Sequence, residues 1–171
     1  MFLNPLPVLM QKAIIGLIVF TIPVLVANAE ESPYVKIHRL TLEMANNAAM
    51  GAVSECRKKG IQISATVVDR NGTTQAVARD TLAPPISIEI SRMKAYTAAN
   101  FTADTSAMEE RGNTAVGRVD GLVMSAGGNI ISAGGINYGA IGVSGAPSGK
   151  TDEECAKAGI QAILEELEMA N

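Results

Sequence analysis

The first regular pattern of apolar and polar positions lies between Thr41 and about Lys59. Apolar residues recur there at intervals of three and four, which places them on one face of an α-helix. They are Leu42, Ala45, Ala49, Ala52 and Cys56. Thr41 is a suitable N-cap because its hydroxyl can accept a backbone N–H bond, and Gly60 is a suitable stop. The pattern therefore predicts one amphipathic helix.

The next segment has a different period. From Ile61 to Val67, apolar and polar residues alternate strictly, which is typical of a strand with one buried face. The turn Asp69–Gly72 follows and contains an Asn-Gly pair, which tolerates the positive φ angles of a tight hairpin. We expect an antiparallel strand to return from Thr73 to Arg79.

Pro84 and Pro85 separate this hairpin from a second helical pattern that ends near Phe101. Its apolar stripe consists of Ile86, Ile90, Met93, Thr97 and Phe101. Residues 102–119 are polar and contain two glycines, so they predict a loop with a short helical turn.

The C-terminal third predicts three more strands. Leu122–Ser125 and Ile130–Ala133 flank a Gly-Gly-Asn turn at residues 127–129. A further strand runs from Tyr138 to Ser144, after the pair Gly134–Gly135.

The chain ends in a predicted helix that follows a capping box at Thr151–Glu154. Its buried face consists of Ala156, Ile160, Ile163, Leu164 and Leu167. The complete order is α-β-β-α-β-β-β-α. Because the strands are joined by hairpins, this order predicts an α+β fold with helices on an antiparallel sheet of about five strands.

Composition narrows the classes of function. The chain has 171 residues, of which 47% are hydrophobic and 18% charged, and its net charge is −3. This length supplies the core of one domain. An acidic chain without a basic run argues against nucleic-acid binding, so small molecules or proteins are the expected partners.

Residues 1–29 have the features of a secretory signal peptide. Lys12 precedes an apolar run from Ala13 to Val26 that is short for a membrane span, and Ala27-Asn28-Ala29 has small residues where signal peptidase cleaves. Cleavage after Ala29 would leave one domain, residues 30–171, which has no membrane span. This domain would be located in the periplasm or outside the cell. A retained anchor helix is the alternative.

Cys56 and Cys155 are the two cysteines of the chain. An even number of cysteines in an oxidising compartment favours a disulfide, but two small buried thiols fit the helical patterns equally well. Both interpretations stay open.

His38 is the only histidine. A neutral imidazole can ligate haem iron, although a lone histidine before a helix is also a common surface or capping residue. The absence of a second histidine excludes a His–His metal site, and no G-x-S-x-G nucleophile elbow is present.

Four residues form a plausible polar constellation: Arg79, Arg92, Lys94 and Tyr138. Arg and Lys suit a carboxylate ligand, and Gly134–Gly135 would let a flat ligand approach the backbone. Solvated surface charges are the alternative interpretation. No nucleophile–base pair is recognisable, so the sequence gives catalysis little support.

Ser144–Thr151 is similar to a phosphate-binding loop. It lacks the first glycine of that pattern, and Pro147 removes a backbone donor. We interpret it as a strand-to-helix turn.

Several blocks together resemble the GlcG/HbpS family over residues 38–168. They are Leu40–Ala45, Val67–Gly72, Arg79, Lys94–Ala98, Gly134–Gly135 and Ala140–Gly145, with Asp152 and Glu153 downstream. That family includes haem-binding proteins, exported haem-responsive partners of sensor systems and the C-terminal domain of PduO-type corrinoid adenosyltransferases. Where many relatives have Asp-Gly-Ala after the arginine, this chain has Asp80–Pro85, so the rim of its pocket can differ.

The resemblance implies a profilin-like α+β fold, homo-oligomers and a tetrapyrrole ligand such as haem. Haem-binding relatives use a histidine near the first helix as an axial ligand, and His38 matches that location. The expected ligand site comprises His38, Arg79, Lys94, Gly134, Gly135 and Tyr138, with His38 on the iron.

In a profilin-like fold the first and last helices pack side by side. If they are antiparallel, Cys56 and Cys155 lie within reach of a disulfide, whereas a parallel pair would hold them apart.

The leading hypothesis is therefore an exported haem-binding protein that senses or sequesters haem. The alternative is a periplasmic accessory protein or enzyme that acts on a small carboxylate such as a hydroxy acid.

Overall fold

The computed structural model describes residues 32–170 of the chain. The chain divides into two units, of which the second, residues 36–171, contains every described helix and strand. The predicted signal segment, residues 1–29, lies outside the described residues. Within residues 32–170, no helix is both long and apolar enough to cross a bilayer.

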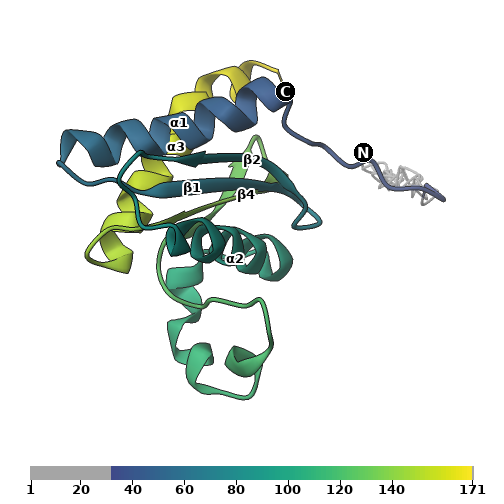
Figure 1. Ribbon diagram of the computed structural model, residues 1–171. Helices are drawn as coiled ribbons and strands as arrows, with labels where there is room; N and C mark the ends of the chain where they lie inside the picture. Colours follow the sequence, from purple (N-terminus) through teal and green to yellow (C-terminus); the bar gives the residue numbers. More distant parts are fainter. Residues whose placement is uncertain (1–31, 171) are drawn as a thin grey trace, which may run out of the picture. The chain divides into compact units, whose positions relative to one another are not determined.

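The second unit has three layers (Figure 1). Its helices are α1 (Leu42–Lys58), α2 (Ile86–Phe101) and α3 (Gly149–Met169). Its strands are β1 (Ser64–Asp69), β2 (Thr74–Arg79), β3 (Gly128–Ala133) and β4 (Ile136–Ser144), paired antiparallel in the order β2-β1-β4-β3. Helices α1 and α3 cover one face of the sheet and α2 covers the other. The α+β class is confirmed, with four strands in residues 32–170 rather than about five.

The missing strand is the one predicted at Leu122–Ser125. Its backbone is engaged elsewhere, because the Val123 N–H donates to the hydroxyl of Thr97 on α2 at 2.9 Å. The turn predicted at residues 127–129 is also wrong, since Gly128 and Asn129 begin β3. The hairpin turn lies at Gly134–Gly135, where φ is +56° and +78°, values that glycine adopts without strain.

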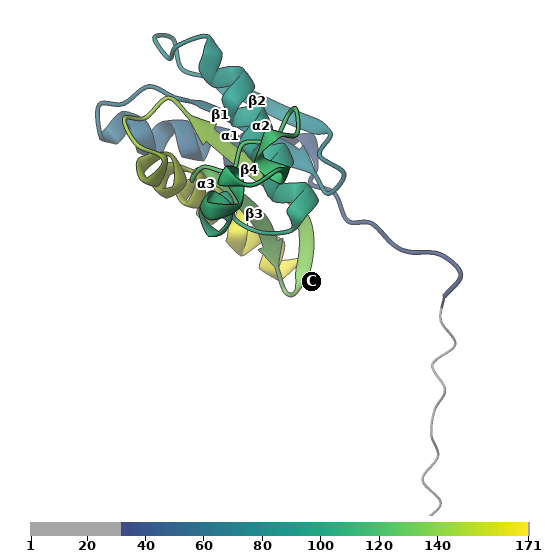
Figure 2. The ribbon, with the colours of Figure 1, turned by 90° about the horizontal axis from the view of Figure 1, so that it is seen from below.

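Helix α2 has the predicted bounds but a different buried face. The buried side chains of α2 are small, apart from Lys94. Of the predicted stripe only Thr97 is buried, whereas Ile86 is 63% exposed. Buried hydroxyls pair across the interface between α2 and the sheet, Ser91 with Thr66 and Ser87 with Ser64, each at 2.8 Å. The helix lies so close to β4 that a Cβ at Gly142 would overlap the Ser91 carbonyl oxygen. Figure 2 shows α2 lying across the sheet.

The region that follows α2 contains the expected short helical turns. They are 3-10 helices at Thr105–Asn113 and Val116–Arg118. In Figure 1 this region forms the lowest part of the molecule, beyond α2.

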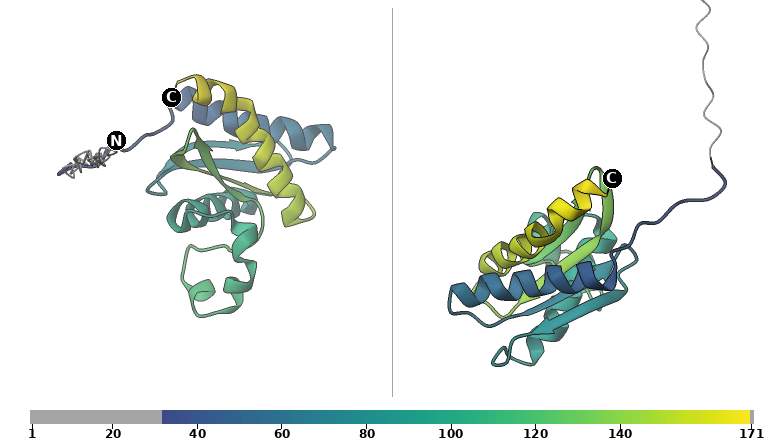
Figure 3. Two further views of the ribbon diagram at one scale, coloured as in Figure 1. Left: turned by 180° about the vertical axis from the view of Figure 1, so that it is seen from behind. Right: turned by 90° about the horizontal axis from the view of Figure 1, so that it is seen from above.

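Helices α1 and α3 pack side by side and run antiparallel (Figure 3). Glycines allow the close contact, because Gly159 lies against the backbone of Ala48 and Gly51 against Ala162. The alanine-rich face of α1 is therefore buried inside the chain and offers no surface to a partner. Homo-oligomer formation stays a prediction that rests on the family resemblance.

The caps of these two helices follow a common rule, in which a hydroxyl accepts a backbone N–H three residues ahead. Thr41 caps α1 as predicted and accepts from Met44 N at 3.2 Å. The cap of α3 is Ser148, which accepts from Thr151 N at 3.2 Å, so the capping box predicted at Thr151 is wrong by three residues.

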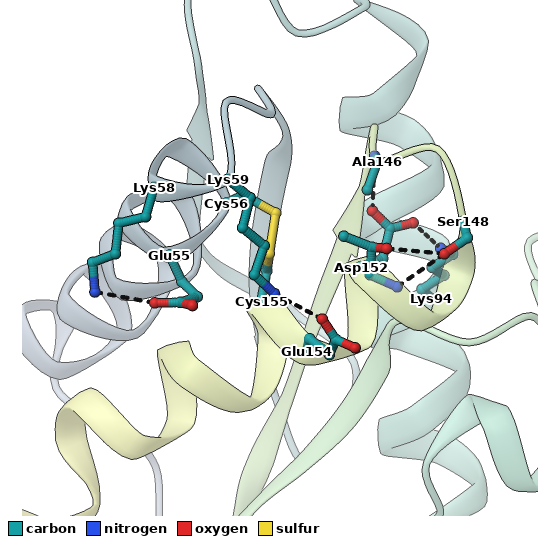
Figure 4. The surroundings of a disulfide bond; sticks show 11 residues. Glu55, Cys56, Lys58, Lys59, Lys94, Ala146, Ser148, Asp152, Glu154 and Cys155 are labelled. Atoms are coloured by element: carbon teal, nitrogen blue, oxygen red, sulfur yellow. Dashed lines mark hydrogen bonds and ion pairs between the residues drawn. A yellow bond between two sulfur atoms is a disulfide. The ribbon is translucent and has the colours of Figure 1, made fainter.

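A disulfide joins the end of α1 to the beginning of α3 (Figure 4). Cys56 and Cys155 lie 99 residues apart in the sequence, and their Cα atoms are 5.7 Å apart. Beside the bridge, Lys59 Nζ pairs with a carboxylate oxygen of Glu154 at 2.7 Å. The antiparallel arrangement thus decides between the two interpretations of the cysteines in favour of a disulfide.

Loss of this disulfide should lower the free energy of unfolding by about 4 kcal/mol, because the bridge closes a long loop in the unfolded chain. We expect the double substitution Cys56→Ala/Cys155→Ala to lower the urea midpoint as much as a reducing agent lowers that of the wild type. Thiol counting on unreduced, denatured wild-type protein should find none. Two reactive thiols would contradict the bridge.

Candidate functional site

A cavity of about 430 Å³ lies where the start of α1 meets the end of α3. This volume falls within the usual range for small-molecule sites. Three parts of the chain line it: the segment before α1 and its first turn, one residue of β4, and the last turn of α3. The lining residues are His38, Arg39, Leu40, Thr41, Glu43, Met44, Tyr138, Glu166, Leu167 and Ala170.

His38 and Tyr138 meet edge to face in this cavity. Their ring centroids are 6.1 Å apart and the ring planes are inclined by 80°. This geometry is favoured for aromatic pairs. Tyr138 is only 7% exposed, whereas His38 is exposed to solvent. The imidazole therefore lies at the mouth, next to a buried phenol ring.

A β-bulge puts Tyr138 on this side of the sheet. Ile131 pairs with Gly139 and Ser132 with Asn137, so Tyr138 is the extra residue in β4. Gly139 adopts φ +140°, and a Cβ there would overlap the carbonyl oxygen of Val68 on β1. Because only glycine fits at this position, the sequence itself determines where the bulge forms. The bulge turns Tyr138 toward the core under α1 and α3.

The segment that carries His38 is attached to the sheet at two points. Gln75, the extra residue of a second bulge in β2, donates from Nε2 to the Leu40 carbonyl at 2.9 Å. Arg39 Nε lies 3.2 Å from Oδ2 of Asp69, a buried carboxylate at the end of β1. These contacts position the residue before them, His38, over β4.

Charge is distributed unevenly around the cavity. Arg39 lies on the side of β1, through its contact with Asp69. Glu166 lies on the opposite side, in the last turn of α3, which packs on β3 and β4. Glu43, in the first turn of α1, adds a second carboxylate. Met44 and Leu167 supply apolar surface between these groups.

The structure does not bring Lys94 to this cavity. Lys94 is 3% exposed under the opposite face of the sheet, where its Nζ donates to Asp152 Oδ2 at 2.8 Å and to the Val143 carbonyl at 3.1 Å. Figure 4 shows this pair beside Ser148 and Ala146. Burial raises the pKa of the Asp152 carboxyl, and the Lys94 ammonium opposes that rise. The pair holds α2 against the start of α3.

The two arginines of the predicted constellation are also separate. Arg79 donates from Nε to the Ala83 carbonyl at 2.9 Å and so holds the loop before α2. Arg92 pairs with Glu89 on its own helix at 2.6 Å. Of the predicted polar constellation, Tyr138 alone lines the cavity, and Asp80–Pro85 does not contribute to its rim.

Gly134 and Gly135 form the exposed turn between β3 and β4 and do not line the cavity. In the segment Ser144–Thr151, the Asp152 carboxylate accepts the Ala146 N–H at 3.0 Å. A carboxylate of the chain itself thus lies against this turn, which agrees with its interpretation as a strand-to-helix connection.

Within residues 32–170, no group of three His, Cys, Asp or Glu side chains is placed to bind a free metal ion. A metal that brings its own equatorial ligands needs less from the protein. Haem iron requires one or two axial ligands, and His38 at an open mouth with apolar surface below it fits that requirement.

Sequence patterns missed Arg39, Glu43, Met44 and the last turn of α3 as parts of the site. Arg39 is adjacent to His38 in the sequence, so its position next to the expected iron ligand could have identified it as part of the site. Glu166 lies more than a hundred residues away, and only the antiparallel packing of α3 on α1 brings it to the cavity. The isolated Gly139 within an apolar strand was the signal for the bulge.

Residues 40–161 match the model of a family described as haem degrading protein HbpS-like. The match covers well over half of the chain. The chain belongs to the HbpS-like family, which confirms the resemblance recognised from the sequence blocks.

Solved structures agree with this assignment. The crystal structure of HbpS is 39% identical, covers 77% of this chain and 94% of its own, and has a TM-score of 0.72. A Streptomyces reticuli HbpS variant with two Glu-to-Asp substitutions is 37% identical, with coverages of 84% and 97% and a TM-score of 0.71. A complex of PduOC with haem shares the fold at 24% identity, coverages of 73% and 95%, and a TM-score of 0.67. Among curated protein sequences, none matches the chain significantly.

Replacement of Lys94 tests whether this residue is structural. Lys94→Met would leave the Asp152 carboxylate buried without its partner, which should lower the free energy of unfolding by about 3 kcal/mol at neutral pH. The unfolded chain releases the Asp152 proton near pH 4, whereas the folded variant retains it to higher pH. The loss of stability should therefore be smallest below pH 4 and grow as pH rises.

The matched control is Lys94→Met/Asp152→Leu, in which neither charge is buried and much of the stability should return. Urea unfolding at several pH values measures both variants. A full loss of stability that does not vary with pH would contradict this account of the pair.

Proposed function

We propose that this protein binds haem and that His38 is an axial ligand of the iron. The observation that carries the proposal is the position of the chain's only histidine, at the mouth of a cavity and in contact with the buried ring of Tyr138. Imidazole is a strong ligand of haem iron, and a partly apolar pocket suits the porphyrin ring.

The proposal assigns a role to each part of the cavity wall. Haem, when bound, would supply an iron that accepts a nitrogen ligand. His38 donates the nitrogen ligand, and Tyr138, Met44 and Leu167 provide apolar contact surface. Arg39 offers a positive charge for carboxylates. The description of the family, and the haem complex of PduOC, support the choice of haem over other flat ligands.

We further propose that the protein works in the periplasm or outside the cell, in haem sensing or sequestration. The signal-like residues 1–29 support export. The Cys56–Cys155 disulfide supports it independently, because such bonds persist mainly in oxidising compartments.

The alternative, action on a small carboxylate, required a cluster of cations. The three basic residues named for it are held in separate places by Ala83, Glu89 and Asp152. No observation favours this second function, so the proposal is limited to haem.

Titration of the mature protein with haemin tests the proposal. The wild type should give a saturable shift of the Soret band, and His38→Ala should weaken binding at least about tenfold through loss of the axial bond. Free imidazole should restore the wild-type spectrum of the variant. Because His38 is exposed, its substitution should leave the unfolding midpoint nearly unchanged. No saturable shift in the wild type would refute haem binding.

A further inference from the structure

We propose that the cavity selects porphyrins whose carboxylates lie on one edge of the ring and rejects those with carboxylates around the whole ring. This inference rests on the proposed haem function and deepens it. It assigns Arg39 and Glu166 as the residues that determine ligand orientation and specificity.

The positive side of the cavity is a fixed arginine. Arg39 Nε lies 3.2 Å from Asp69 Oδ2, and the Asp69 side chain is 3% exposed. Asp69 also accepts N–H bonds from Asn71 at 2.9 Å and Thr73 at 3.0 Å, so it is itself held firmly. The arginine side chain is 55% exposed, and a guanidinium with one nitrogen at Asp69 has further N–H donors for a carboxylate.

The negative side consists of the last turn of α3. Glu166 lines the cavity there, together with Leu167 and Ala170. The C-terminal end of a helix carries partial negative charge on its last carbonyls, and the last turn of α3 contains no basic residue to offset it.

The two sides cannot be exchanged, because Arg39 is held by β1 and Glu166 is carried by the helix on β3 and β4. Haem has two propionates on one edge, which can face Arg39 while the apolar edge faces α3. A porphyrin with four propionates spread around the ring must direct at least one toward Glu166. Like charges at close range disfavour that complex.

The experiment compares three probes by absorbance titration at fixed ionic strength. They are haemin, with two carboxylates, iron(III) coproporphyrin III, with four, and haemin dimethyl ester, with none. We expect the wild type to bind coproporphyrin at least about tenfold more weakly than haemin. The substitution Glu166→Gln should bring the two affinities within about threefold, mainly by strengthening coproporphyrin binding.

Glu165→Gln is the matched control. It removes the same charge from the neighbouring position of α3, but Glu165 does not line the cavity, so the affinity ratio should stay at the wild-type value. Arg39→Gln should weaken binding of haemin more than binding of the ester, because only haemin loses a charge contact in addition to the altered support of His38, and Arg39→Lys should restore part of the loss.

The outcomes separate the two claims. Absence of saturable haemin binding would overturn both the proposed function and this inference. Saturable haemin binding with equal affinity for coproporphyrin would overturn the inference alone. An equal effect of Glu165→Gln and Glu166→Gln on the affinity ratio would also overturn it, because net charge would then explain the selectivity.

Discussion

Strand β4 approaches its neighbours more closely than any side chain allows, and the other elements are arranged around that constraint. At Gly142, the backbone of α2 occupies the place of a Cβ, and at Gly139 the carbonyl of Val68 does the same. The first contact lets α2 lie directly on the sheet through serine hydroxyls and alanines. The second creates the bulge that redirects Tyr138. One strand without side chains at two positions thus sets both the layer spacing and the site.

The cavity follows from this bulge and from the direction of two helices. Because α1 and α3 are antiparallel, the start of one meets the end of the other, and the disulfide fastens their opposite ends. His38 is then held over Tyr138 by contacts of its neighbours with Asp69 and Gln75. The site is therefore a junction of three distant segments, and its residues have no common sequence motif.

This arrangement explains what the sequence could predict. Local rules predicted α1, its Thr41 cap and the Asn-Gly turn, because each depends on neighbouring residues. The alternation over Ile61–Val67 predicted a strand with one buried face, which is wrong: β1 is Ser64–Asp69 and all six of its residues are buried, because helices cover both faces of the sheet. The predicted apolar stripe of α2 was wrong because buried hydroxyl pairs replace apolar contacts there. The spacing of apolar residues therefore did not indicate which face of the helix is buried. Lys94 was misplaced for a similar reason, since nothing in its surroundings in the sequence identifies Asp152 as its partner. His38 was recognised through the family resemblance, whereas Glu166 required the tertiary structure.

The most direct test of the account is to detect the bond between His38 and the iron. Because the chain has a single histidine, protein without an affinity tag can be prepared with ¹⁵N in that imidazole alone and loaded with haemin. Electron–nuclear double resonance then reports whether a labelled nitrogen is coupled to the iron. The account predicts a ¹⁵N coupling that disappears in His38→Ala. A spectrum that contains only porphyrin nitrogens, unchanged by the label, would contradict it.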